Sequence, residues 1–106
     1  MGTVTAMTID FEHAAIEVTN ARERSRYEIA LDGRVVGFAD YRPAGDRVVF
    51  PHTVIDAPLR GQGLGERLVR AALDDVRRHG CKVVARCWFV AEFIDAHPEY
   101  EELRAA

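Results

Sequence analysis

The sequence is poor in the residues that define several classes of protein. It contains two cysteines, Cys81 and Cys87, and neither stands beside a further Cys or His cluster at metal-ligand spacing. This scarcity excludes a disulfide framework and argues against a zinc site. The four histidines form neither an HExxH nor an HxxxH pattern, so the sequence predicts no bound metal.

Long hydrophobic runs are also missing, and no apolar segment approaches the length that spans a bilayer. Residues 1–10 lack the basic and apolar stretches of a secretory signal. Met7 is an alternative start, and we expect residues 1–10 to be poorly ordered. The formal net charge is −3 and the arginines are dispersed, which argues against general nucleic-acid binding. We therefore expect a reduced, cytoplasmic protein with no membrane or nucleic-acid partner.

What is present fits one globular domain over residues 1–106. The composition is 48% hydrophobic and 29% charged, which is ordinary for a folded domain. Alternating apolar residues and the hairpin signal Asp32-Gly33 indicate strands in the first half of the chain. We expect strands at 14–18, 27–31, 34–41 and 47–56, and turns at 19–26, 32–33 and 42–46. Pro51 predicts a bulge or an edge in the last strand, because proline cannot donate to a ladder.

The second half begins with an amphipathic helix whose apolar residues repeat at helical spacing. Its predicted buried face consists of Leu64, Leu68, Val69, Ala72, Leu73 and Val76. Gly80 follows a basic last turn and is a natural C-terminal cap. A strand at 82–87, a second helix at 88–96 and a final turn at 99–103, after Pro98, complete the chain.

Strand, helix and strand in this order form a βαβ crossover, so strands 47–56 and 82–87 should run parallel. The predicted fold class is α/β (α+β): antiparallel N-terminal strands, then a crossover with a parallel pair, then a C-terminal helix. The crossover places the start of the first helix and Cys87 at one edge of the sheet, where ligands bind in such folds.

A glycine loop, Gly61, Gly63 and Gly65, separates strand 47–56 from the first helix. No Ser, Thr, Asp or Asn at 58–65 can cap that helix, so its first amides lack a side-chain partner. Glycine also permits positive φ and the close approach of a ligand. With the helix dipole behind the loop and Arg60 beside it, this arrangement favours an anion, most simply a phosphate. A purely structural turn is the alternative, and neither a GxGxxG nor a nucleoside-triphosphatase loop fits.

Cys87 lies directly before the second predicted helix, a position that favours a thiolate. Its alternative role is that of a small buried hydrophobe, as for most unpaired cysteines. Cys81 stands beside the capping Gly80, away from the ligand edge, and is predicted to be structural.

The loop Arg60-Gly61-Gln62-Gly63-Leu64-Gly65 resembles the acetyl-CoA pyrophosphate loop, Arg/Gln-x-x-Gly-x-Gly, of the GNAT N-acetyltransferase superfamily. Together with segments 52–54, 87–90 and 97–100, it is similar to the small single-domain branch of that superfamily. The resemblance covers about residues 14–103 and implies a GNAT-like mixed sheet.

The resemblance implies an N-acetyltransferase with acetyl-CoA as cosubstrate and an amine, on a small molecule or a protein, as acceptor. The residues that would bind the CoA pyrophosphate are Arg60, Gly61, Gln62, Gly63, Leu64 and Gly65. Thr53, Val54 and Ile55 would offer backbone groups to the pantetheine arm. The alternatives are a non-catalytic CoA-binding module and a small α/β domain whose loop binds no cofactor.

Transfer to an amine requires a base, since a lysine-like amine has a pKa of about 10, and a donor for the oxyanion. Because histidine suits proton transfer near neutral pH, His52 is the predicted base, and a strand histidine with a satisfied ring is the alternative. Cys87 would lie near the thioester, as a proton donor to the leaving thiolate or as a nucleophile. We favour direct transfer.

Two further expectations follow from the resemblance. Tyr100 resembles a late tyrosine that acts as an acid elsewhere in the superfamily, but core packing is the favoured interpretation. Longer members insert helices after their first strand to wall in the acceptor. Only 19–26 separates the first strands here, so the acceptor side should be open and shallow.

Overall fold

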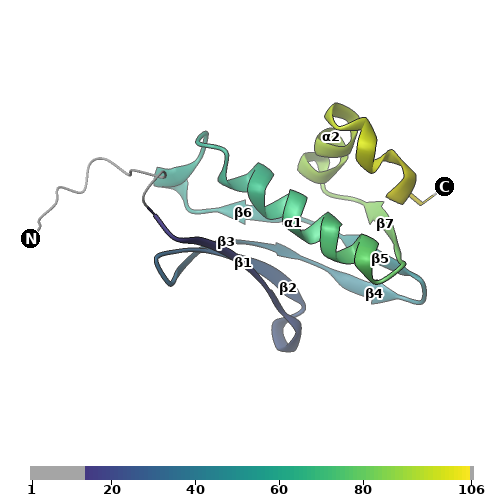
Figure 1. The fold of residues 1–106 in the computed structure, drawn as a ribbon, viewed down its shortest axis with the longest axis horizontal. Coiled ribbons are helices and arrows are strands. Elements are labelled where there is room, and N and C mark those ends of the chain that lie inside the picture. The colour runs from purple at the N-terminus through teal and green to yellow at the C-terminus, as the bar shows by residue number, and fades with distance from the viewer. Residues whose placement is uncertain (1–13, 106) are drawn as a thin grey trace, which may run out of the picture.

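The structure is a computed structural model that describes residues 14–105. Its strands form two sheets, and the long helix α1 (Leu64–Arg78) lies across them (Figure 1). The expectations for residues 1–10 and for Met7 lie outside the described residues. Within 14–105, no helix is both long enough and apolar enough to pass through a membrane.

The first sheet has the strand order β1-β2-β3-β6, and every pair in it is antiparallel. The strands are β1 (Ile16–Ala21), β2 (Arg26–Leu31), β3 (Arg34–Asp40) and β6 (Thr53–Ile55). The predicted hairpin is confirmed, because Asp32 and Gly33 adopt positive φ angles of 49° and 86°. A register shift between Ile29 and Ala30 marks a bulge between β2 and β3.

The turn predicted at 19–26 is partly wrong, because Thr19 and Asn20 belong to β1. The chain turns instead over the 3-10 helix η1 (Arg22–Arg24) and Ser25, whose φ of 53° is left-handed. Pairing with β2 gives the Thr19 backbone groups partners and outweighs the local preference of this segment for a turn. The Asn20 side chain also accepts a hydrogen bond of 2.7 Å from the Tyr41 hydroxyl.

The second sheet has the order β4-β5-β7. Its strands are β4 (Arg42–Ala44), β5 (Arg47–Phe50) and β7 (Lys82–Ala85). β4 occupies most of the turn predicted at 42–46, which narrows to Gly45, with a φ of 66°, and Asp46. The predicted crossover is confirmed, because β5 and β7 run parallel.

The strand predicted at 47–56 is divided at Pro51 and His52. β5 before the break pairs with β4 and β7 in the second sheet, whereas β6 after it pairs with β3 in the first. Proline lacks an N–H and cannot continue a ladder, which explains the position of the break. The chain therefore crosses from one sheet to the other within two residues.

Helix α1 begins and ends as predicted. Its six expected core residues are each at most 2% exposed: Leu64, Leu68, Val69, Ala72, Leu73 and Val76. At its C-terminus, the Gly80 N–H donates to the Arg77 carbonyl at 3.0 Å and the Cys81 N–H to the Val76 carbonyl at 3.2 Å. Gly80 has a φ of 73°, so the helix ends in a Schellman motif.

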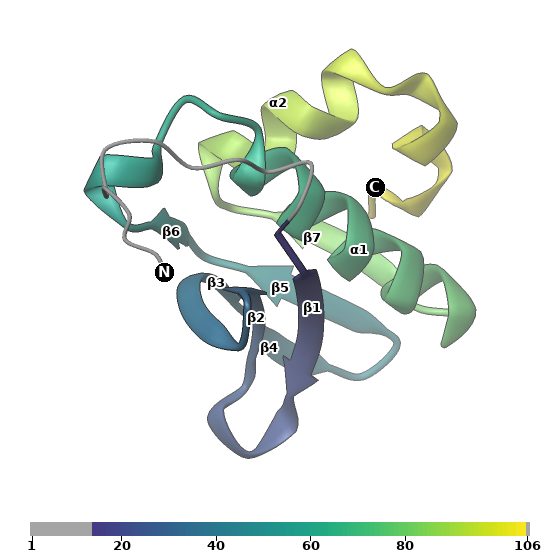
Figure 2. The same ribbon diagram turned by 60° about the vertical axis from the view of Figure 1, so that its left-hand side comes forward.

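The remaining helices agree with the predictions, except η2, which the sequence did not predict. They are η2 (Ala57–Leu59), α2 (Trp88–Ala96) and η3 (Pro98–Leu103). α2 contacts both α1 and β7, and it lies at the upper edge of the molecule in Figure 2. The predicted mixed fold is thereby confirmed, and the parallel pair lies beside the start of α2.

Candidate functional site

A cavity opens where the parallel pair ends. The Phe50 carbonyl accepts hydrogen bonds from the N–H groups of Arg86 at 3.1 Å and Cys87 at 2.9 Å. Beyond this point the segments that follow β5 and β7 diverge. β6 turns toward β3, and the chain after β7 enters α2. A cavity of about 640 Å³ fills the gap. It is lined by Pro51, His52, Thr53, Ile55, Leu59, Arg60, Gly61, Gly63, Leu64, Gly65, Glu66, Arg86, Cys87, Trp88 and Phe89.

This cavity brings together most of the residues predicted for the site. The predicted residues that line it are His52, Thr53, Ile55, Arg60, Gly61, Gly63, Leu64, Gly65 and Cys87. Val54 and Gln62 are not among its lining residues. Arg86 and Trp88 line the cavity without having been predicted. Trp88 is 70% exposed. A tryptophan at the first position of the second predicted helix was the sequence signal that could have indicated it.

The glycine loop has the geometry that an anion site requires. Gly61 and Gly63 adopt φ angles of 80° and 87°, and a Cβ on either would meet nothing within 4 Å. Gly63 is the N-cap of α1, and no side chain caps the helix. The bond from the Arg67 N–H to the Gly63 carbonyl, at 3.1 Å, is the first of the helix. The amides at 64–66 therefore have no acceptor within the helix and face an open cavity.

Gly65 has a different role from the other two glycines. A Cβ at this position would lie 2.9 Å from the Phe89 ring. The absence of a side chain thus lets the first turn of α1 approach the start of α2 closely. Beside the loop, Arg60 Nε donates to the Ile55 carbonyl at 3.0 Å. This bond holds the guanidinium at the end of β6, and its terminal nitrogens can still donate to an anion.

The register of β6 decides which of its backbone groups face the cavity. The Asp40 N–H donates to the His52 carbonyl at 3.1 Å, and the Asp56 N–H donates to the Val36 carbonyl at 2.8 Å. Because hydrogen-bonded positions alternate in an antiparallel ladder, the Val54 backbone groups also face β3. The groups of Thr53 and Ile55 face the open edge of the sheet. Of the three residues predicted for the pantetheine arm, only Thr53 and Ile55 therefore have backbone groups that a ligand could reach.

Cys87 is at the N-cap of α2 and is only 6% exposed. Its Sγ donates to the Thr53 Oγ1 at 3.6 Å. This bond connects the start of α2 to the start of β6. The thiol thus lies at the deep end of the cavity. Cys81 is half-buried, and its Sγ contacts the His79 carbonyl at 3.8 Å, at the far end of α1. This position agrees with a structural role for Cys81.

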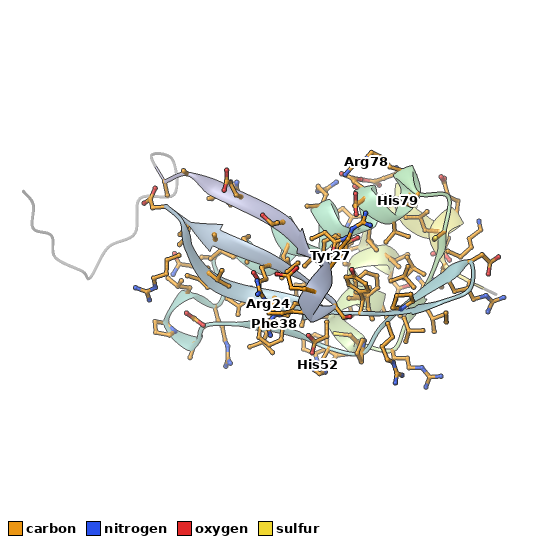
Figure 3. All side chains as sticks on the ribbon, turned by 90° about the horizontal axis from the view of Figure 1, so that it is seen from below. Arg24, Tyr27, Phe38, His52, Arg78 and His79 are labelled. Carbon is orange, nitrogen blue, oxygen red and sulfur yellow. The ribbon has the colours of Figure 1, made fainter. Side chains whose placement is uncertain are left out.

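His52 lies on the opposite face of β6 from Thr53, because side chains alternate along a strand. Its Nε2 is 2.6 Å from the Asp40 Oδ2. The Phe38 ring meets the imidazole edge-on, with centroids 6.5 Å apart. Figure 3 places Phe38 and His52 on the side of the sheet away from the α1 residue His79. The cavity is thus reached by Cys87 from the α1 side and by His52 from the opposite face.

Asp40 is a further residue near the site that the sequence prediction missed. It ends β3, and only the pairing of β3 with the segment after Pro51 brings it to His52. The bulge in β3 shifts the alternation of this strand, so the sequence pattern gave no firm indication of the face on which Asp40 lies. An acidic residue at the end of a strand was the one available signal.

Tyr100 is part of the core. It is 3% exposed, its hydroxyl donates to the Asp74 Oδ1 at 2.7 Å, and it does not line the cavity. Burial and the neighbouring Asp74 carboxylate raise the pKa of Tyr100. The favoured interpretation of core packing therefore agrees with its position. Within 14–105, no group of three His, Cys, Asp or Glu side chains is placed to hold a metal.

The sequence matches a known protein family over most of its length. Residues 26–103 match the GCN5-related N-acetyl-transferase family. The chain belongs to this family. Protein NATD1 of Gallus gallus and of Homo sapiens are each 31% identical to it over 87 residues. The matches cover 78% of this chain and 77% and 75% of those proteins.

Solved structures support the fold. A GCN5-like protein from Staphylococcus aureus superposes with a TM-score of 0.66 at 22% identity, over 85% of this chain and 88% of that chain. A ribosomal-protein-alanine N-acetyltransferase from Brucella melitensis biovar Abortus 2308 gives 0.51 at 23% identity, over 76% of this chain and 61% of that one. The predicted family and fold class are thereby confirmed. Membership of the family supports acyltransferase chemistry in general.

Proposed function

We propose that this protein is an N-acyltransferase that moves an acetyl group from acetyl-CoA to an amine at an open, shallow acceptor site. The observation that carries the proposal is the cavity at the split strand. It joins an uncapped helix N-terminus to a buried thiol and a histidine, within one opening between diverging strands. Family membership supports the same class of chemistry.

The residues present suit the CoA moiety. The amides at 64–66 and the Arg60 guanidinium would bind the pyrophosphate, and the side-chain-free surfaces of Gly61 and Gly63 leave room for it. The backbone groups of Thr53 and Ile55 at the open edge of β6 would hold the pantetheine arm. When bound, acetyl-CoA would supply an acyl group already activated as a thioester.

The proton chemistry would fall to His52. A neutral amine that bonds to the acyl carbon must lose one proton, and the electron pair of the broken C–S bond leaves with the CoA sulfur. An imidazole can take that proton near neutral pH. Cys87 lines the cavity, and its thiol would donate a proton to the leaving thiolate. Direct transfer between the two substrates needs no acyl-enzyme.

The acceptor side is proposed to be the face of the first sheet that carries His52. Only the short η1 connects β1 and β2, so no helix from that connection walls in the acceptor. A protruding amine on a protein or a small amine would suit such a surface. Free thiols at Cys81 and Cys87 fit a cytoplasmic location, which we propose together with a single functional domain over residues 1–106.

The cofactor proposal is tested by titrating the protein with acetyl-CoA. Calorimetry measures the affinity, and the fluorescence of Trp88, the single tryptophan, reports a change at the cavity rim. Gly63→Val places a side chain where the phosphates would lie, so we expect a loss of at least about tenfold in affinity, or about 1.4 kcal/mol. Unchanged affinity in this variant would refute the loop assignment.

Gly45→Val is the matched control. Gly45 also has a positive φ, of 66°, and a Cβ there would also meet nothing within 4 Å, but it lies in the β4–β5 turn. The control should carry similar backbone strain and bind acetyl-CoA like the wild type.

Enzyme and non-catalytic CoA-binding module are distinguished by an acceptor screen. A panel of peptides, polyamines and small primary amines is incubated with acetyl-CoA, and products are identified by mass spectrometry. The proposal expects at least one acceptor to gain an acetyl group above the enzyme-free blank. Binding of acetyl-CoA without any acetylated acceptor would favour the module.

A further inference from the structure

We infer that Asp40 is a positioning residue that fixes the His52 ring with its Nε2–H toward β3 and leaves Nδ1 as the nitrogen that accepts a proton. The catalytic meaning of this arrangement rests on the proposed function. The arrangement itself rests on contacts between the last residue of β3 and the residue that precedes β6.

Two contacts hold the pair together. The Asp40 N–H donates to the His52 carbonyl at 3.1 Å, so the backbones are fixed in register. On the same face, the Asp40 Oδ2 is 2.6 Å from the His52 Nε2. An ionised carboxylate can only accept, and therefore Nε2 must carry the hydrogen. In the neutral ring the unprotonated nitrogen is then Nδ1.

The other charged side chains beside Asp40 bond to one another. Arg26 stands opposite Asp40 in the register of β2 and β3, and its guanidinium bonds to the Glu28 Oε2 at 3.0 Å and lies over the Phe38 ring at 4.2 Å. Arg24 bonds to the same Glu28 carboxylate at 2.9 Å, and the Asp40 carboxylate makes its ion pair with His52. The His52 side chain is 58% exposed and that of Asp40 30%. An exposed pair of this kind adds little stability, so its value would lie in orientation.

The pair completes the proton balance of the proposed reaction. As the amine nitrogen bonds to the acyl carbon, its proton passes to Nδ1 and the ring becomes an imidazolium. The Asp40 carboxylate, already bonded to Nε2–H, stabilises that positive charge without taking a proton itself. After CoA has left, the imidazolium gives its proton to solvent and the Cys87 thiolate takes one from solvent, which restores both groups.

The tautomer is measured on the ligand-free protein by long-range ¹H–¹⁵N NMR, at a pH where the ring is neutral. We expect the wild type to show the Nε2–H form. Asp40→Asn should raise the population of the Nδ1–H form, because the amide NH₂ can donate to Nε2. Asp46→Asn, at the exposed β4–β5 turn, is the control and should leave the His52 signals unchanged. A wild-type ring in the Nδ1–H form overturns the inference, as does an Asp40→Asn spectrum identical to that of the wild type.

Kinetics supply a second readout with the amine found in the acceptor screen. Asp40→Asn should lower kcat by about tenfold or more while KM for acetyl-CoA changes less than about twofold, since the cofactor residues are untouched. Asp40→Glu should recover part of kcat, because it restores a carboxylate acceptor. Equal kcat in Asp40→Asn and wild type would overturn the inference but leave the proposed function standing. If no amine is acetylated, the proposed function fails and the tautomer still decides the inference.

Discussion

Cys87 combines burial with a position on the cavity. Its side chain is 6% exposed, yet it contacts the Thr53 hydroxyl and faces the space between the diverging strands. A thiol that served only as a small hydrophobe would not need a place at the N-cap of α2. The contact with Thr53 fixes the position of the sulfur at the wall of the cavity.

Substitutions of Cys87 separate the roles of proton donor and nucleophile. Cys87→Ser keeps a hydrogen-bond donor, so we expect it to retain clearly more turnover than Cys87→Ala, with acetyl-CoA affinity within about twofold of the wild type for both. Steady-state rates and calorimetry measure these quantities. Intact-protein mass spectrometry after incubation with acetyl-CoA should show no acetylated wild-type enzyme. An acetyl group retained on Cys87, together with an inactive serine variant, would establish a two-step route instead.

Among the elements, β6 depends most on its neighbours. It is a short edge strand of the first sheet, and it forms one wall of the cavity. Gly37 of β3 lies against it: a Cβ there would be 2.5 Å from the Ile55 Cδ1 and 2.7 Å from the Val54 carbonyl oxygen. A backbone atom cannot move aside as a side chain can. β6 can therefore pack this closely against β3 only because residue 37 has no side chain.

Gly37→Ala should therefore displace β6. We expect a destabilisation of about 1–3 kcal/mol, as for other overpacked sites, together with weaker binding of acetyl-CoA. Urea unfolding and calorimetry measure the two effects. Val35→Ala on the same strand is the control, because Val35 is 47% exposed and its loss removes little buried surface. Wild-type stability and affinity in the Gly37 variant would show that β6 does not form the cofactor wall.

The elements also show what could be predicted from the sequence. Helix α1, its core face, the Gly80 cap and the uncapped glycine loop are encoded locally, in spacing and in φ preference, and were predicted. The end of β1 was not, because pairing with β2 decided it. The contact between Asp40 and His52 needed the exchange of sheets at Pro51 and the bulge in β3, which depend on distant strands.

At the scale of the whole molecule, the two faces of the first sheet differ. One face packs against α1 and forms the core, and the other carries the His52–Asp40 pair. Tyr27 belongs to the core face and links the sheet to α1, since its hydroxyl donates to the Asp75 Oδ2 at 2.7 Å. Burial, followed by the bond to Asp75, raises the pKa of Tyr27 above that of a free tyrosine.

This link makes the stability of the protein depend on pH in the alkaline range. Because the folded pKa of Tyr27 is raised, its stabilising effect is complete below the unfolded value of about 10 and declines as the pH rises above it. Tyr27→Phe should cost about 1 kcal/mol near neutral pH, and this difference from the wild type should shrink above about pH 10. Urea unfolding of the wild type and of Tyr27→Phe, near neutral pH and above about pH 10, tests this prediction. A difference that is equal at both values would contradict it.

The break at Pro51 and His52 has a consequence for how the protein can change over time. These two residues separate the strand that pairs with β7 from the one that pairs with β3, and His52 is also the predicted base. A substitution there alters the width of the cofactor opening and the placement of the imidazole together. In the proposed enzyme, cofactor affinity and acceptor choice would therefore change together with any substitution at this point.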